Sequence, residues 1–130
     1  MMQAALAVQI AIRDALLAHA GLSGMPVHDG VPQGTAAPYI TIAKIESKDW
    51  STKDAKGAEH MVTLHVWSRH AGKAAAYGVL AEIDAALDGA GLTLADHHLV
   101  NLSTVFWTVT PEPGDLYRGL VRLRATTEPL

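Results

Sequence analysis

The sequence contains no cysteine and only a small excess of charge of one sign. Its 130 residues include 13 acidic and 10 basic side chains, which gives a formal net charge of -3. Without cysteine the chain cannot form disulfides, use a thiol in catalysis or hold zinc through thiolates. The small, evenly spread charge leaves no basic footprint of the kind that accompanies nucleic-acid binding. We therefore expect no specific binding to nucleic acid.

The N-terminal stretch lacks the features of a signal peptide and of a membrane span. Residues 1–20 are apolar, but they have no basic n-region, and Arg13 and Asp14 interrupt them. A membrane-spanning helix needs about 20 predominantly apolar residues. We expect no membrane contact here. The length, with 49% hydrophobic residues, suits one core, so we predict a single domain over residues 1–130.

Two segments have the apolar spacing of helices. In the first, two neighbouring stripes follow the helical repeat, formed by Leu6, Ile10, Arg13 and Leu17 and by Val8, Ile12 and Leu16. We expect this helix to bury much of its circumference. The second covers about residues 71–90, with one apolar face of Ala76, Val79, Leu80, Ile83 and Leu87. We expect the helices to end with Gly21 and Gly91 in the left-handed C′ position.

Four segments alternate as strands do. They are residues 39–46, 59–68, 97–110 and 116–127, and the turn 111–115 separates the last two. In the last strand, Val121, Leu123 and Ala125 are expected to face the core. The predicted order is α-β-β-α-β-β. This is an α+β fold in which two helices pack on one face of a mainly antiparallel sheet of four or more strands.

The second face of that sheet has no predicted cover. Alternation places on it Met61, Trp67, either Phe106 or Trp107, Arg118, Arg122 and Arg124. Aromatic and arginine side chains are enriched at the centres of protein interfaces. We predict that this face mediates self-assembly, the alternative being a solvated face with a few isolated apolar groups. Glu46 and Glu59 are too few to neutralise three arginines, so carboxylates of a partner are expected to pair with at least one of them.

No arrangement of residues predicts catalysis. There is no G-x-S-x-G nucleophile elbow, and no glycine-rich loop fits a phosphate-binding pattern. His60 and His65 lie five apart on one strand and face opposite sides, as do the adjacent His97 and His98. A cross-strand pair such as His65 with His98 remains the open metal alternative. We expect no catalytic residue, no cofactor and no metal.

The sequence resembles the tail-completion, or tail-terminator, family of long-tailed phages. The resemblance rests on HDGVPQG (28–34), PYITI (38–42), DWSTK (49–53), EHMVTLHVWSR (59–69) and YRGLVRLRATTEP (117–129). It covers nearly the whole chain in the right order and is greatest for members in prophages and gene transfer agents, where the family is often described only as a domain of unknown function.

Membership of that family implies a structural virion protein without cofactor or catalysis. Such a protein forms a ring, usually a hexamer, at the head-proximal end of the tail tube. There it stops tube growth and provides the surface that docks to the head connector or stopper protein. The implied location is the virion tail, after assembly in the bacterial cytoplasm, and the implied partners are further copies, the major tail tube protein and the connector.

The polar loop of residues 47–57 and the uncovered sheet face supply the expected contacts. The candidate interface residues are Asp49, Trp50, Ser51, Lys53, Trp67, Arg118, Arg122 and Arg124. We assign the sheet face and adjoining strand edges to the ring, the loop to a neighbour or the tail tube, and the turn 111–115 to the opposite rim. The alternative for the loop is a mobile connection whose Trp50 folds back on its own domain.

Two other functions stay open on the sequence alone. One is a different neck or minor tail component, such as a head-completion stopper, because α+β rings recur at several levels of a phage neck. The other is a small metal-dependent enzyme, which would need a pocket where several polar groups converge.

Overall fold

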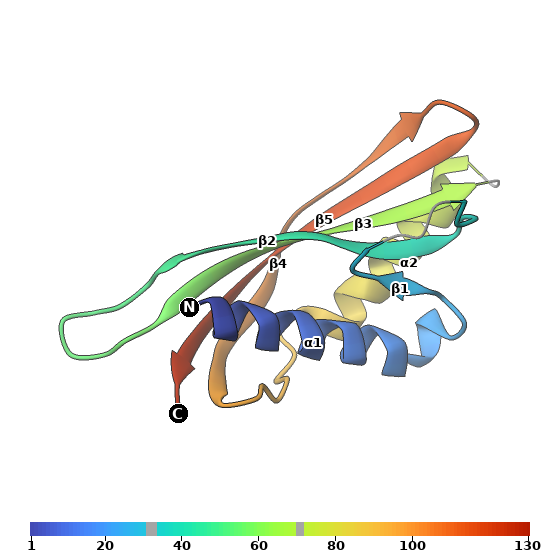
Figure 1. Ribbon diagram of the computed structural model, residues 1–130. Helices are drawn as coiled ribbons and strands as arrows, with labels where there is room; N and C mark the ends of the chain where they lie inside the picture. The colour runs from blue at the N-terminus through green and yellow to red at the C-terminus, as the bar shows by residue number, and fades with distance from the viewer. Residues whose placement is uncertain (31–33, 70–71) are drawn as a thin grey trace.

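The computed structural model describes residues 1–30, 34–69 and 72–130, with two helices on one side of a five-stranded sheet (Figure 1). The order of the strands is β1-β2-β3-β5-β4. In chain order the elements are α1 (Met2–Ala18), a 3-10 turn (Ala20–Leu22), β1 (Val27–His28), β2 (Tyr39–Asp49), β3 (Ala58–Arg69), α2 (Gly72–Leu87), β4 (His97–Glu112) and β5 (Leu116–Pro129). No helix in the described ranges is long and apolar enough to cross a membrane.

The α+β class is confirmed, but the sheet is mixed. The pairs β2–β3, β3–β5 and β5–β4 are antiparallel, as expected, while β1 pairs in parallel with β2, so that Val27 lies opposite Ile40. The predicted element order lacked β1. A two-residue strand has no alternation to detect, so the sequence pattern could not reveal it.

The core lies between the helices and one face of the sheet, which we call the covered face. Its fully buried large side chains include Ile12, Leu16, Ile40, Leu64, Ile83, Leu87, Leu102 and Leu123. The predicted alternation of β5 is confirmed, because Val121, Leu123 and Ala125 are all buried. On the same strand Gly119 allows α2 to approach closely, since an added Cβ would lie 3.3 Å from a side-chain carbon of Leu80.

Both predicted helix ends are wrong. The first helix ends at Ala18 with His19 in an extended conformation, and Gly21 lies within the 3-10 turn. A Cβ at Gly21 would overlap the Glu82 carboxylate, so that side chain would have to move away from His19 Nε2, which it contacts at 2.7 Å. The second helix ends at Leu87, and the glycine with positive φ beyond it is Gly89 (+71°) and not Gly91.

The first helix also buries less of its circumference than expected. Its buried residues are Ala4, Ala7, Val8, Ile12 and Leu16. The predicted stripe through Leu6, Ile10 and Leu17 lies instead on the solvent side and is about half exposed. A single layer of helix on sheet covers only one side of the helix, so the second apolar stripe has no cover among the described segments.

A bulge in β4 decides which way its aromatic residues point. The ladder with β5 shifts between Thr104 and Phe106, so that Thr104 lies opposite Leu123 and Phe106 lies opposite Arg122. Regular alternation would put Thr104 and Phe106 on the same face, and the extra residue separates them. Phe106 therefore lies on the uncovered face of the sheet, here called the outer face, and Trp107 lies on the covered face.

Candidate assembly interface

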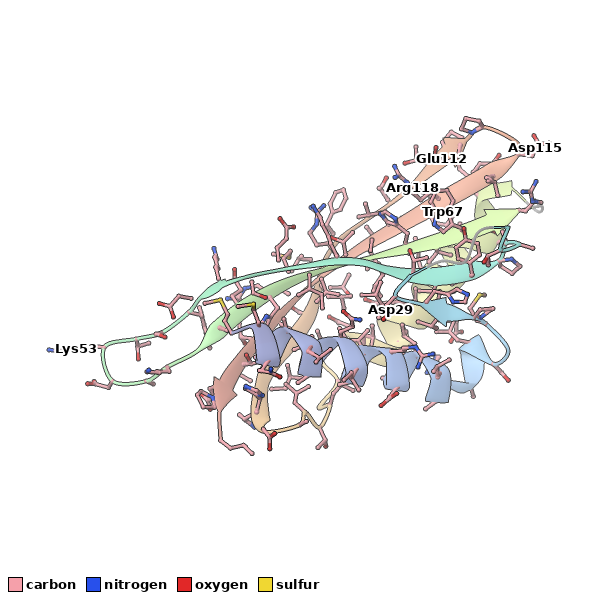
Figure 2. The ribbon with its side chains drawn as sticks, viewed as in Figure 1. Asp29, Lys53, Trp67, Glu112, Asp115 and Arg118 are labelled. Atoms are coloured by element: carbon pink, nitrogen blue, oxygen red, sulfur yellow. The ribbon has the colours of Figure 1, made fainter. Side chains whose placement is uncertain are left out.

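The hairpin between β2 and β3 forms an arm, residues 50–57, that projects past the N-terminal end of α1 (Figure 1) with Lys53 at its tip (Figure 2). Asp49 Oδ1 accepts hydrogen bonds from Ser51 Oγ (2.6 Å) and from the Ser51 backbone N–H (3.3 Å). Gly57 N–H donates to Ser51 Oγ (3.1 Å), and Trp50 N–H donates to the Gly57 carbonyl (2.9 Å). Asp49 and Ser51 thus order the base of the arm from within.

Trp50 lies partly against its own domain. Trp50 is 40% exposed. The rest of its indole packs against Gly57, where an added Cβ would lie 3.0 Å from the ring. The guanidinium carbon of Arg124 lies 5.9 Å from the centre of the indole ring, close enough for a cation–π contact. Part of the ring therefore remains available while the rest is held in place.

The three arginines of β5 project from the outer face, as alternation predicted, but two of them have carboxylate partners within the chain. Arg124 Nε donates to Glu59 Oε2 at 2.6 Å. Arg118 Nε lies 3.3 Å from Glu112 Oε1, an ion pair without hydrogen-bond geometry. Glu59, one of the two acidic residues considered from the sequence, thus pairs with Arg124, and Glu112, which was not considered, pairs with Arg118. Glu112 was missed because a turn separates it from Arg118 in sequence, and only the hairpin brings them together.

Arg122 differs from the other two arginines. Its guanidinium carbon lies 5.6 Å from the centre of the Phe106 ring. No ion pair joins it to a carboxylate in the described part of the chain. Arg122 is therefore the arginine that we expect to pair with a carboxylate of another chain.

Trp67 lies at the far end of the outer face from the arm. Figure 2 shows it with Arg118 and Glu112 near the turn that joins β4 to β5. Its ring centre is 6.4 Å from that of Tyr39 and 6.2 Å from that of His65, the latter edge to face at 86°. Desolvation, with Arg118 nearby, lowers the pKa of His65, so this end of the face favours the neutral imidazole. Trp67 and the three arginines thus lie along the outer face, whereas Asp49, Ser51 and Lys53 belong to the hairpin end beyond it.

The histidines that the structure describes do not assemble a metal site. Because β5 separates β3 from β4, His65 and His98 cannot form the cross-strand pair that the sequence left open. His60 is fully buried, with Nδ1 2.7 Å from Ser47 Oγ and Nε2 2.9 Å from Thr127 Oγ1. Burial lowers its pKa. Within residues 1–30, 34–69 and 72–130 no three His, Asp or Glu side chains are placed to hold an ion.

A groove of about 630 Å³ between α2 and β4 was missed by the sequence analysis. We call it the α2–β4 groove, and its lining includes Tyr77, Leu80, Asp84, Asp88, Thr104 and Trp107. Tyr77 and Trp107 pack edge to face with ring centres 5.6 Å apart. Asp84 and Asp88 each accept a hydrogen bond from Thr104, at 2.7 and 2.8 Å. The available signal was Tyr77 itself, a large aromatic residue beside the apolar stripe of the second helix.

The comparisons with known proteins agree with this geometry. The family model described as tail completion protein gp17 matches residues 10–128. Among solved structures, a chain from the virion of a native gene transfer agent particle has 32% sequence identity and a TM-score of 0.86, over 95% of this chain and 96% of that chain. No curated protein matches the sequence. The chain therefore belongs to the tail completion protein gp17 family, which makes it a structural protein and not an enzyme.

Proposed function

We propose that this chain forms a closed ring, a hexamer, at the head-proximal end of a long phage-like tail, where it ends tube growth and joins the tail to the head connector. Its family and its similarity to a gene transfer agent virion chain support a place in a tailed particle. The ring assembles in the bacterial cytoplasm before the particle is complete.

The observation that carries this proposal is the outer face of the sheet. Neither helix covers it, yet it presents Trp50, Trp67 and Phe106 together with the arginines of β5. Exposed aromatic surface among oriented arginines is typical of interface centres. Because Arg118 and Arg124 are already held by carboxylates, less side-chain entropy is lost when a partner binds. Arg122 is left to pair with a carboxylate of the neighbouring subunit or of the tail tube protein.

Termination follows from closure of the ring. Identical subunits joined head to tail either close into a ring or grow into a filament, according to the rotation between neighbours. A terminator must also show the tube one surface and the connector another. Figure 2 shows Lys53 of the arm and Asp115 of the β4–β5 turn at opposite ends of the molecule. We assign the arm to a neighbour or to the tail tube protein, and the turn 111–115 to the opposite rim.

Two measurements test the proposal. Native mass spectrometry of the purified protein over a concentration series is expected to show a closed oligomer of six, with monomer at low concentration. Reconstruction of intact particles is expected to place that ring between tail tube and connector. A single copy per particle, or a ring on the head side of the connector, would refute the terminator assignment, and the second outcome would identify a head-completion stopper.

A further inference from the structure

The first helix is apolar on two opposite sides, and only one of them is buried in the chain. Met2, Leu6, Ile10, Arg13 and Leu17 share the solvent side, because their spacing follows the helical repeat. We call this set the α1 stripe. Leu6, Ile10 and Leu17 are 50%, 52% and 48% exposed. Helices that are apolar all round are normally buried. No described segment of this chain packs on the α1 stripe, so we expect a partner to cover it.

The α2–β4 groove is the second apolar surface without a cover. Trp107 is 54% exposed, the highest value of the three tryptophans, although it lies on the covered face of the sheet. Its ring and that of Tyr77 form an apolar corner at the edge strand β4, with Val105 beside them. Exposed aromatic residues in a concave site are typical anchors or receptors for a partner side chain.

The two surfaces carry opposite charge. Asp84 and Asp88 line the groove, and none of the described lining residues is basic. Each aspartate uses Oδ1 for Thr104, and no described residue bonds its Oδ2. On the α1 stripe, Arg13 Nε donates weakly to the Val27 carbonyl at 3.4 Å. Its terminal amino groups have no partner in the described part of the chain, so they can donate to a carboxylate.

One chain cannot bring the two surfaces together. α1 contacts β1 and β2, α2 contacts β3, β4 and β5, and the groove lies where α2 meets the β4 edge. α2 therefore stands between α1 and the groove. Two different patches that complement each other but cannot meet within one molecule are what a head-to-tail ring requires.

We propose that the α1 stripe of one copy packs into the α2–β4 groove of the next, with Arg13 facing Asp84 and Asp88. The inference rests on the proposed ring and names the contact that joins its neighbours. It adds a contact on the helical layer, where each subunit contributes a different patch, to the contacts of the outer face proposed above.

Crosslinking tests the contact cleanly because the chain has no cysteine. Ile10→Cys and Tyr77→Cys proteins are prepared separately and treated with a bis-maleimide, alone and mixed. We expect covalent dimers only in the mixture. The double variant, purified and within particles, is expected to give a ladder that ends at the ring number. Ala95→Cys, on an exposed loop outside both patches, is the matched control and should not crosslink with either.

A charge exchange gives the second readout. Arg13→Glu and Asp84→Arg are each expected to raise the apparent dissociation constant for self-association by roughly tenfold or more, and their mixture in one assembly should recover much of that loss. Asp84→Asn keeps the acceptor for Thr104 and controls for folding. Rings that form normally, without crosslinks in the mixture or in particles, would overturn this contact and leave the proposed ring intact. A protein that is single-copy in particles would refute the ring and this contact together, and crosslinks within each single variant would show a two-fold contact instead.

Discussion

Glu59 on β3 accepts a hydrogen bond of 2.6 Å from the Nε–H of Arg124 on β5. Lys48 approaches the same carboxylate at 3.3 Å. The glutamate thus fixes one end of the arginine row beside the base of the arm, where the Arg124 guanidinium also meets the Trp50 ring. The arm and the arginine row therefore meet at Arg124, which Glu59 holds in place.

The first prediction concerns pH. The hydrogen bond from Arg124 holds the pKa of Glu59 below its ordinary value. A lowered folded-state pKa contributes stability that is present above the ordinary glutamate pKa and is lost as pH falls through the folded-state value. We expect Glu59→Gln to lower the melting temperature at neutral pH and to converge with the wild type in acid. Glu46→Gln, which removes only an exposed pair with Lys44, is the control. A difference in melting temperature between wild type and Glu59→Gln that stays constant with pH would contradict the lowered pKa of Glu59.

The second prediction concerns Trp50. Trp50→Ala is expected to weaken joining of ring or tail by roughly 1 to 4 kcal/mol, the range for truncation of an interface anchor, and to lower the melting temperature only slightly, because the indole is partly exposed. Thermal melts and particle yield measure the two effects. Trp50→Phe retains an aromatic ring and should assemble better. A large loss of stability with normal particle yield would make Trp50 a core residue.

The third prediction concerns Arg122, whose guanidinium has, among the residues that the structure describes, only the Phe106 ring as a partner. Loss of that exposed contact costs about 0.5–1 kcal/mol, so Arg122→Glu should give folded, soluble subunits. These subunits should fail to join heads to tails, because a partner carboxylate would now face a like charge. Arg122→Lys keeps the positive charge and should retain part of the activity in particle assembly. A normal yield of infectious or transducing particles from Arg122→Glu would show that the outer face around Arg122 is not part of the interface.

The fourth prediction concerns His60, which is buried between two hydroxyl groups. Burial lowers its pKa, so the folded state favours the neutral ring. The unfolded chain binds a proton first as pH falls below the ordinary histidine pKa, and the stability due to the neutral ring is lost from there down to the folded-state pKa. His60→Ala should lower the free energy of unfolding by about 1–3 kcal/mol at neutral pH, since it leaves the buried Thr127 hydroxyl without its imidazole partner.

Denaturant unfolding at several pH values measures the His60 effect. The variant should show less loss of stability than the wild type across the window just below the ordinary histidine pKa. Ser47→Ala, which removes only one of the two partners, should cost less than His60→Ala. Identical pH profiles for wild type and His60→Ala would show that this imidazole does not titrate with folding.

The sequence predicted the long elements well and the local exceptions badly. Strict alternation over residues 116–127 identified β5 because every second side chain has the same environment. The bulge before Phe106 left no such trace, since one extra residue changes the face of a side chain without changing composition. Leu6 and Ile10 were expected to be buried because their apolar spacing is typical of a packed helix face. The spacing does not show whether that face packs within the same chain or against a partner. Glu112 and Tyr77 matter only through contacts between distant segments.

The bulges of β4 also bear on solubility. A 16-residue edge strand would offer a long row of free backbone donors and acceptors to any other strand, which is the usual start of fibre formation. Register shifts at Leu99/Asn101 and Thr104/Phe106 interrupt that row twice. Strands cannot then add to the edge along its full length. In a protein proposed to stop the growth of a tube, the irregular edge also hinders unassembled subunits from pairing edge to edge and aggregating.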